Sequence, residues 1–592
     1  MSVDKPRPPP ERREPPVSER LDSWKEIAAY LKRDKSTARR WEKEGLPVHR
    51  HAHKKKATIC AYTSEIDVWW KDGRVRLEAA ESAAAGRRRG AAWWAAAGLV
   101  LLGVGVGLGL NVAGVRDRLL GRPAAVEVTS IAVLPLKNLS GDPGQDYFAD
   151  GMTEALVTEL GKISGLRVLS YRSAIGYRQT AKPLSEIARE LKVDTLLEGA
   201  VLRSGDRVRI TANLVAAVPE RHLWAQTYEF DSRDILAVQG EVARDAARQI
   251  RVKVTPQEQA RLTTSRRVDP EAYEAYLLGR AYFNKVPAGT SWMRAKEYFE
   301  KAIAKDPGFA PAYAGLAQLY ARTRGSLARD PGANRVQARQ WAEKALKLDD
   351  TLAETHTALA RVTFHEWNWA GAEREYRRAL ELNPSNALAR IWYAQYLYCT
   401  KRFEEAVTQA RLAQQLDPGS LFVNTWAGTA YFLAGRVEDA MASWQKALEL
   451  DPGYPDASIA LAWSYVTRGL HQNAISALQK ALIFTDREPL VLGALAHAHA
   501  RAGQRAEALK IVSELKRLEE RVGPEDRNIP RFSFVWAYAG LGDKEQAFAW
   551  LEKAYQERRD LMIGLNIDPL VDPLRSDPRF QDLVRRVGLP SK

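Results

Sequence analysis

A spacing of 34 residues runs through the C-terminal half of the chain and restricts the folds open to it. It separates a series of alanines: Ala338, Ala372, Ala406, Ala440, Ala474 and Ala508. A repeat of this length is typical of stacked helical pairs, in which each unit has an apolar face that only its neighbours can cover. We expect about eight such units over residues 270–558, followed by a C-terminal cap at 559–592.

The residues within one unit fall at the positions of the tetratricopeptide repeat (TPR). The first helix carries Asn424, Ala427, Gly428 and Tyr431, and the second carries Ala440, Trp444 and Ala447 before Pro452. The proline ends the second helix because its ring cannot be accommodated in the next turn. The repeat therefore resembles the TPR family. This resemblance implies an all-α solenoid that binds a protein or peptide partner in its concave groove.

Residues 126–254 alternate strand and helix patterns, which predicts an α/β domain. The stretches IAVLPLKNLSGDPGQDYFADGMTEALVTEL and VDTLLEGAVLRSGDRVRITANLV resemble the TolB N-terminal-like domain. The resemblance implies a non-catalytic module. Asp142, Asp146 and Asp150 are better interpreted as loop and helix-start acids than as metal ligands, because no calcium-loop glutamate follows them. No phosphate-binding loop, nucleophile elbow or kinase signature is present.

Residues 1–20 are rich in proline and charge and predict a disordered tail, whereas residues 21–75 predict a small winged helix-turn-helix domain. Ser23 and Glu26 have the spacing of a capping box at the first helix. The second helix runs from about Lys35 and stops at Gly45, and Trp41 is expected to pack inward. A basic hairpin follows. The candidate DNA contacts are Lys35, Ser36, Thr37, Arg39, Arg40, Lys43, Arg50, Lys54, Lys55 and Lys56.

This N-terminal stretch resembles the MerR/excisionase-like winged helix-turn-helix domains in SWKEIAAYL, RRWEKEGLPVHRH and AYTSEIDVWW. The resemblance implies DNA binding through the second helix and the hairpin wing. Residues 1–90 hold 22 basic and 14 acidic residues, more than half of the formal charge of +15, which favours a polyanionic partner at the N-terminus. His49, His51 and His53 alternate along one predicted strand, but no acid or cysteine cluster joins them, so we predict no metal site and no cofactor.

A long uncharged stretch lies between Arg89 and Arg116, after a basic linker at 76–90. It predicts a single transmembrane helix at 91–113. The bias of the flanking arginines predicts a bacterial inner-membrane protein with a cytoplasmic N-terminus and a periplasmic C-terminus. A candidate face for homodimer formation in the membrane consists of Gly103, Gly105, Gly107 and Gly109.

The predicted fold class is thus multidomain: a small winged helix-turn-helix, a single transmembrane helix, an α/β domain and an all-α TPR solenoid. The layout resembles the membrane-bound one-component transcription regulators of the ToxR or CadC type, which carry a different winged-helix head. The leading hypothesis is a membrane-anchored DNA-binding regulator whose outer part binds a protein or peptide signal. The alternative is an envelope TPR scaffold or assembly protein with a basic, membrane-orienting head. An enzyme, such as a nucleotide cyclase, is a third hypothesis for which no catalytic residues were found.

Overall fold

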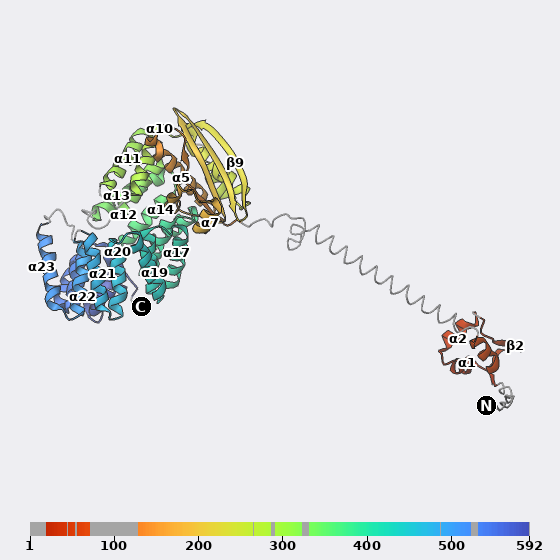
Figure 1. Ribbon diagram of the computed structural model, residues 1–592. Helices are drawn as coiled ribbons and strands as arrows, with labels where there is room; N and C mark the ends of the chain where they lie inside the picture. Colours follow the sequence, from red (N-terminus) through yellow and green to blue (C-terminus); the bar gives the residue numbers. More distant parts are fainter. Residues whose placement is uncertain are drawn as a thin grey trace, which may run out of the picture. The chain divides into compact units, whose positions relative to one another are not determined.

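The structure is a computed structural model, and its parts are shown in Figure 1. It describes residues 19–43, 45–53, 56–71, 128–263, 266–285, 290–322, 331–485, 487–521 and 531–590. The chain divides into two compact units, residues 1–126 and residues 127–592.

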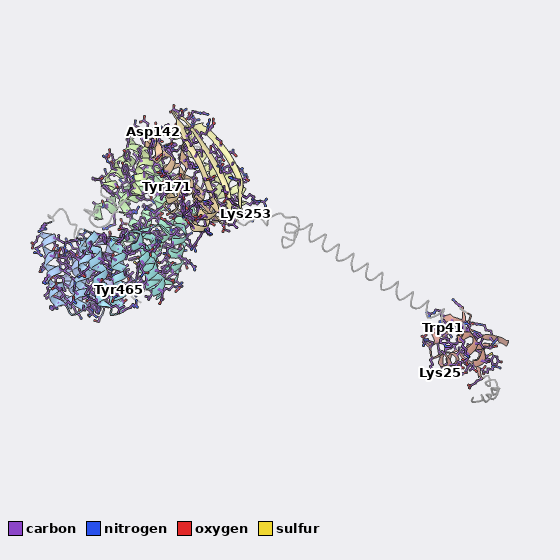
Figure 2. All side chains as sticks on the ribbon, viewed as in Figure 1. Lys25, Trp41, Asp142, Tyr171, Lys253 and Tyr465 are labelled. Atoms are coloured by element: carbon purple, nitrogen blue, oxygen red, sulfur yellow. The ribbon has the colours of Figure 1, made fainter. Side chains whose placement is uncertain are left out.

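The described part of the N-terminal unit combines short helices with a three-stranded antiparallel sheet of order β1-β3-β2. Its elements are β1 (Arg20–Leu21), α1 (Trp24–Tyr30), α2 (Lys35–Glu42), β2 (His49–His53), β3 (Lys56–Tyr62) and a helix over 63–71. Ile27, Ala38 and Ile66 are fully buried in one small core. Trp41, labelled in Figure 2, is 3% exposed in the same core, which agrees with the inward packing expected of it.

Local capping explains why α1 and α2 begin where they do. The Ser23 hydroxyl accepts a hydrogen bond from the backbone of Glu26, as predicted. The Glu26 carboxylate accepts from the backbone of Asp22 rather than from that of Ser23, so the expected capping box is displaced by one residue. Asp34 caps α2 through the backbone N–H groups of Ser36 and Thr37, a role that sequence analysis missed.

The α/β domain of the second unit has a mixed sheet of order β6-β4-β7-β8-β9, with β5 paired to β7. Its strands are β4 (Ser130–Val133), β5 (Lys137–Asn138), β6 (Arg167–Val168), β7 (Thr195–Ser204), β8 (Arg207–Ala217) and β9 (Glu220–Asp231). Its α-helices are α5 (Asp146–Gly161), α6 (Tyr171–Ala174), α7 (Leu184–Leu191), α8 (Ile235–Gln249) and α9 (Pro256–Arg261). The long antiparallel β7–β8–β9 meander turns at Gly205, whose φ of +58° glycine tolerates well.

Helices cover both faces of this sheet. Phe148 and Leu156 of α5 share one core with Val242 of α8, and Ile187 and Leu191 of α7 belong to a second core. Helix α5 lies between the sheet and the first helices of the solenoid (Figure 1). The predicted α/β region is therefore present, and it shares one compact unit with the helical array.

Eight helical pairs follow in the described residues. They are α10 (Pro270–Phe283) and α11 (Ser291–Lys305), α12 (Ala310–Arg322) and α13 (Pro331–Leu348), α14 (Ala353–His365) and α15 (Trp369–Leu382), α16 (Ala387–Cys399) and α17 (Phe403–Leu416), α18 (Leu421–Leu433) and α19 (Val437–Leu450), α20 (Pro455–Thr467) and α21 (His471–Phe484), α22 (Pro489–Arg501) and α23 (Arg505–Arg521), and α24 (Arg531–Leu541) and α25 (Lys544–Gln556). After them come η6 (Asp560–Gly564), η7 (Pro569–Leu574) and α26 (Pro578–Val587).

Small residues at the repeated positions allow the two helices of each pair to approach closely. All six alanines of the 34-residue series are fully buried. At Gly428, an added Cβ would lie 2.5 Å from Nε1 of Trp444, so the glycine leaves the space that this indole fills. The helical array predicted from the spacing is confirmed, and its physical cause is this close packing.

No helix in the described part of the chain is long and apolar enough to cross a lipid bilayer. This finding contradicts the prediction of a single-pass inner-membrane protein with a periplasmic C-terminus, which is withdrawn. Residues 91–113, on which the predicted helix falls, lie outside the described residues. The same holds for the predicted dimer-face residues Gly103, Gly105, Gly107 and Gly109.

Candidate functional site

The first helices of the eight pairs line one face of the solenoid, which we call the inner face: α10, α12, α14, α16, α18, α20, α22 and α24. Two other parts of the same chain lie against it. Helix α5 of the α/β domain contacts its first repeats. The C-terminal segment, residues 560–590, contacts its later repeats. The groove expected to bind a peptide is therefore covered in these regions by the chain itself.

Buried polar contacts hold the α/β domain against the solenoid. Arg280 of α10 forms an ion pair with Glu154 of α5, and less than a fifth of each side chain is exposed. Ser170 donates a hydrogen bond of 2.7 Å to Asp417, which precedes α18. Burial raises the pKa of Asp417, although the nearby charge of Arg172 opposes the rise. The first contact joins α5 to the first pair, and the second joins the start of α6 to the end of α17 in the fourth pair.

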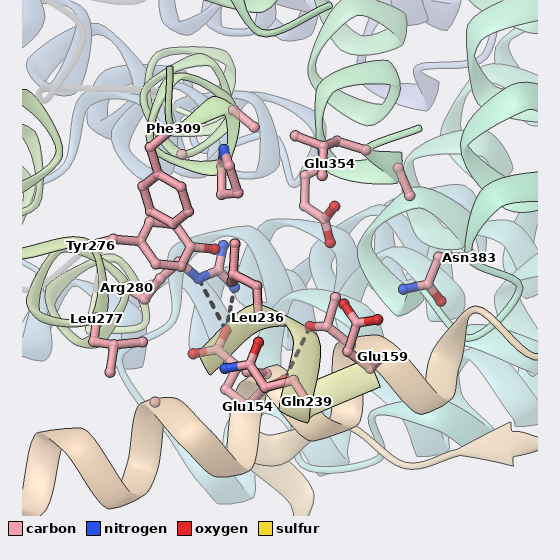
Figure 3. Close-up of a pocket in the computed structure, with 18 of the residues that line it drawn as sticks. Glu154, Glu159, Leu236, Gln239, Tyr276, Leu277, Arg280, Phe309, Glu354 and Asn383 are labelled. Atoms are coloured by element: carbon pink, nitrogen blue, oxygen red, sulfur yellow. Dashed lines mark hydrogen bonds and ion pairs between the residues drawn. The ribbon is translucent and has the colours of Figure 1, made fainter. Parts of the chain in front are cut away.

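A cavity of about 100 Å³ lies between α5, α8 and the first three repeats (Figure 3). Its apolar wall includes Leu236, Tyr276, Leu277, Phe309 and Pro311. Its polar wall includes Glu154, Glu159, Lys162, Gln239, Arg280, Glu354 and Asn383. Figure 3 shows the carboxylate of Glu354 directed toward the side of the cavity where Arg280 and Glu159 lie. The cavity thus combines aromatic and charged groups from both domains.

The C-terminal segment connects distant repeats. The indole nitrogen of Trp536 in α24 donates a hydrogen bond of 2.6 Å to Asp568, which is 4% exposed. Asp560 forms an ion pair of 3.1 Å with Arg335 of α13. The indole of Trp369 donates to the carbonyl oxygen of Val587 at 3.2 Å. Residues from the second, third and eighth pairs are thereby tied together.

A second cavity, of about 80 Å³, lies beneath the C-terminal segment. Arg361, His365, Trp426, Trp463 and Asp560 are among its lining residues. Burial lowers the pKa of His365 to about 4, so this imidazole is neutral at physiological pH. The C-terminal segment closes the cavity on one side.

A groove of about 570 Å³ lies among α19, α20 and α21, and we call it the α19–α21 groove. Leu461 and Tyr465 of α20 line it, and Tyr465 is labelled in Figure 2. Ile483 is 77% exposed and Phe484 62% exposed at the end of α21, on the same groove. Large apolar side chains exposed together mark an interaction surface.

The structure places several of the predicted DNA contacts on the surface of the N-terminal unit. Lys35, Ser36, Arg39 and Lys43 are exposed on or next to α2. The guanidinium of Arg39 lies over the ring of Trp24, with 5.9 Å between its central carbon and the ring centroid. Exposed cations therefore run along α2, from its first residue to its C-cap.

Other predicted contacts are engaged within this unit or lie outside the described residues. The hydroxyls of Ser36 and Thr37 donate hydrogen bonds to Asp34, and these bonds hold the pKa of Asp34 well below its usual range. Arg50 forms an ion pair of 2.7 Å with Glu42. Arg40 also has an interaction partner. Lys54, Lys55 and the side chain of Lys56 are outside the described residues.

Metal-binding geometry is not found in the described ranges: no three or more His, Cys, Asp or Glu side chains are grouped to hold an ion. Within the N-terminal unit, His49 instead pairs with Glu65 at 2.7 Å. In the α/β domain, Asp142 caps a 3-10 turn by accepting from Gly144, and Asp146 accepts from the side chain of Asn138.

Comparisons with known proteins identify the repeats. A tetratricopeptide repeat model matches residues 367–420, and a TPR repeat model matches residues 428–469. The chain is 39% identical over 234 residues to "Putative adenylate cyclase 3" of Rhizobium meliloti (strain 1021), covering 39% of this chain and 39% of that protein. It is 41% identical over 73 residues to "Type IV pilus assembly protein PilF" of Pseudomonas aeruginosa, covering 12% of this chain and 29% of that protein.

Two solved structures are similar to part of the chain. Pseudomonas aeruginosa PilF is 25% identical, with a TM-score of 0.29, and the match covers 38% of this chain and 96% of that one. The pilus biogenesis factor PilW is 20% identical, with a TM-score of 0.31, and the match covers 36% of this chain and 96% of that one. The present chain thus spans less than half the length of the curated relatives it matches.

The fold and these matches define the class of the C-terminal half: it is a TPR solenoid, and it is joined to an α/β region. The particular features of this chain are the α/β domain and the C-terminal segment on its inner face, and the exposed α19–α21 groove.

Proposed function

We propose that the chain is a TPR scaffold that docks a segment of a partner protein in the α19–α21 groove. The observation that carries this proposal is the exposure of Ile483 and Phe484 beside that groove. Water is displaced from both side chains when a partner covers them, which favours association. The α/β domain and the C-terminal segment already lie on the inner face, so the partner uses this other surface.

The chemistry of the groove indicates what kind of segment fits. Apolar Leu461 and Phe484 line it together with the polar Asn473 and the cationic Lys480. An amphipathic helix with a row of apolar side chains and an acidic neighbour complements this mixture. The relative named as a pilus assembly protein supports a role in assembly, since its match is at 41% identity.

Replacing Ile483 and Phe484 together with glutamate is expected to abolish partner docking while leaving the solenoid folded, because both side chains are mostly solvent-exposed. The measurement is site-specific photocrosslinking from Lys480 in cell extract, comparing the crosslinked bands of the wild type and the variant. Leu509→Glu, at a side chain 44% exposed on α23, is the matched control. Identical bands from the wild type and the double variant would contradict the docking site.

A second candidate function concerns the N-terminal unit, for which we propose DNA binding through α2. The observation that favours it is the set of exposed cations Lys35, Arg39 and Lys43 on or next to a helix capped by Asp34. A second helix presented in this way is the element that enters the major groove in helix-turn-helix proteins. The resemblance to the MerR/excisionase-like domains also supports DNA binding through α2.

The DNA proposal predicts a steep dependence of affinity on salt. Each cation that contacts a phosphate contributes about 0.9 to the slope of log K against log salt concentration. Arg39→Gln combined with Lys43→Gln is therefore expected to reduce the slope by about two, measured by fluorescence anisotropy of a labelled duplex with the full chain. Lys25→Gln with Lys71→Gln, two exposed cations elsewhere in the unit, is the control. Equal slopes for all three proteins would argue against this interface.

The scaffold proposal includes no catalytic step, although one relative is named a putative adenylate cyclase. Conversion of ATP to cyclic AMP by the full chain would contradict it. The proposal names no cofactor.

A further inference from the structure

The cavity between the α/β domain and the first repeats is lined by three carboxylates and two cations. The carboxylate of Glu154 is paired with Arg280. That of Glu159 is paired with Lys162 at 2.6 Å. Glu354 also lines the cavity, and in the described part of the chain its carboxylate has no hydrogen-bond or ion-pair partner. The wall of the cavity therefore carries a net negative charge.

Arg280 and Lys162, the two cations of the cavity wall, form ion pairs with Glu154 and Glu159. Burial lowers the pKa of Arg280, but the charges of Glu154, Tyr276 and Glu354 and the hydrogen bond to Glu154 together hold it above its usual value, so the guanidinium stays protonated. Its two hydrogen bonds to Glu154 aim it at α5, as the dashed lines in Figure 3 show. Glu354 lines the cavity, and no cation among the described residues lies within ion-pair distance of its carboxylate.

A second polar group of the same wall is buried and has an unused donor. Asn383 is 6% exposed, and its side-chain oxygen accepts a hydrogen bond of 3.0 Å from the backbone of Ser385. Its amide nitrogen has no hydrogen-bond partner among the residues described here, and it lines the cavity. A ligand that accepts from this amide would satisfy a donor that the described chain leaves free.

The apolar part of the wall suits an organic cation. The rings of Tyr276 and Phe309 lie edge to face, with centroids 5.3 Å apart, and both rings line the cavity. Aromatic rings attract ammonium groups and also pack against short aliphatic stems. Sites for small molecules occur preferentially at domain interfaces and combine apolar walls with a few polar groups.

We propose that this cavity binds a short-chain amino acid, with its ammonium group at Glu354 and its carboxylate accepting from Asn383. The cavity volume of about 100 Å³ limits the ligand to a few non-hydrogen atoms. Because the walls come from α5 on one side and from three repeats on the other, the ligand would contact both domains. This inference is independent of the docking groove at α19–α21.

Isothermal titration calorimetry on the full chain tests the site with three matched probes: β-alanine, propylamine and propionate. We expect β-alanine to bind more tightly than propylamine and propionate not to bind. Glu354→Gln is expected to weaken the binding of both amines by about tenfold or more, because it removes a charge-assisted hydrogen bond. Glu438→Gln is the matched control, since Glu438 is an exposed glutamate in the first turn of α19, as Glu354 is in the first turn of α14.

A further variant separates the two ends of the ligand. Asn383→Asp keeps the oxygen that accepts from Ser385 but removes the donor, so it is expected to weaken β-alanine binding and not propylamine binding. Circular dichroism confirms that each variant is folded. The proposal is overturned if no amine binds at millimolar concentration, if Glu354→Gln binds unchanged, or if propionate binds as well as propylamine. A lysine tripeptide with an acetylated N-terminus serves as a further probe. If it binds more tightly than β-alanine, the proposal is also overturned, because the cavity then binds the side chain of a peptide and not a free amino acid.

Discussion

Replacing Trp444 with alanine is expected to lower the free energy of unfolding by about 3–5 kcal/mol, the range measured for large aromatic residues removed from cores. The side chain is fully buried. Its indole nitrogen donates a hydrogen bond of 3.0 Å to the carbonyl oxygen of Thr425, and its ring lies 5.7 Å from that of Phe432. Alanine leaves a cavity between two helices and removes one of the hydrogen bonds to the Thr425 carbonyl oxygen, which keeps the one from the Thr429 hydroxyl. Urea unfolding followed by circular dichroism measures the loss.

The control is Phe484→Ala, which removes a ring that is 62% exposed and is expected to change the unfolding free energy by less than about 0.5 kcal/mol. Gly428→Ala supplies an independent check, because its new Cβ would lie 2.5 Å from Nε1 of Trp444. Gly428→Ala should lower the free energy of unfolding of the wild type. It should lower that of the Trp444→Ala variant by less, because the space next to residue 428 is then empty. Strict additivity of the two changes would contradict the packing described.

The repeat could be predicted because it depends on contacts close in sequence. Ala440 and Gly428 are in the two helices of one pair, and each pair packs on the next, so a spacing of 34 residues records the geometry directly. The start of α1 could be predicted for the same reason, since Ser23 caps it locally. The cap of α2, Asp34, was not predicted, although it directly precedes Lys35, where that helix was expected to begin.

The covering of the inner face could not be predicted from periodicity. Its contacts join residues far apart in the chain, such as Glu154 with Arg280 and Ser170 with Asp417. One signal was available: Arg280 is a charge inside the apolar run AYLLGRAYF, where a buried partner is needed. The sequence does not say which carboxylate supplies that partner. The cavity that contains Glu354 exists only once both domains are in place.

A pH-dependent contribution to stability is expected from the C-terminal segment. Burial raises the pKa of Asp568 to about 7, against the hydrogen bonds from Leu570 and Trp536 and the charge of Arg575, which lower it. In the unfolded chain the same carboxyl titrates near its model value of 3.8. Because the folded pKa is the higher one, the protonated form is favoured by folding. The contribution of protonated Asp568 to the free energy of unfolding is fully present below pH 3.8 and is lost as the pH rises through 7.

Asp568→Asn is expected to remove this dependence, because the amide does not titrate. The unfolding free energy of the variant minus that of the wild type should increase with pH. The expected increase is about 1.4 kcal/mol per pH unit between the two pKa values, or about 4 kcal/mol in total from pH 4 to pH 8. The variant loses one of the two hydrogen bonds that Asp568 accepts, because its amide has a single acceptor oxygen. This loss lowers its unfolding free energy by the same amount at every pH.

The buried histidines do not obscure the result. Burial lowers the pKa of His365 and of His497 to about 4, so they destabilise the fold as pH falls below 6.5, opposite in sign to Asp568. Both titrate equally in the wild type and the variant, and their contribution cancels in the difference. Urea denaturation at half-unit steps of pH measures it. A difference that stays constant with pH would mean that Asp568 is ionised in the folded chain, and that the C-terminal segment does not bury its charge.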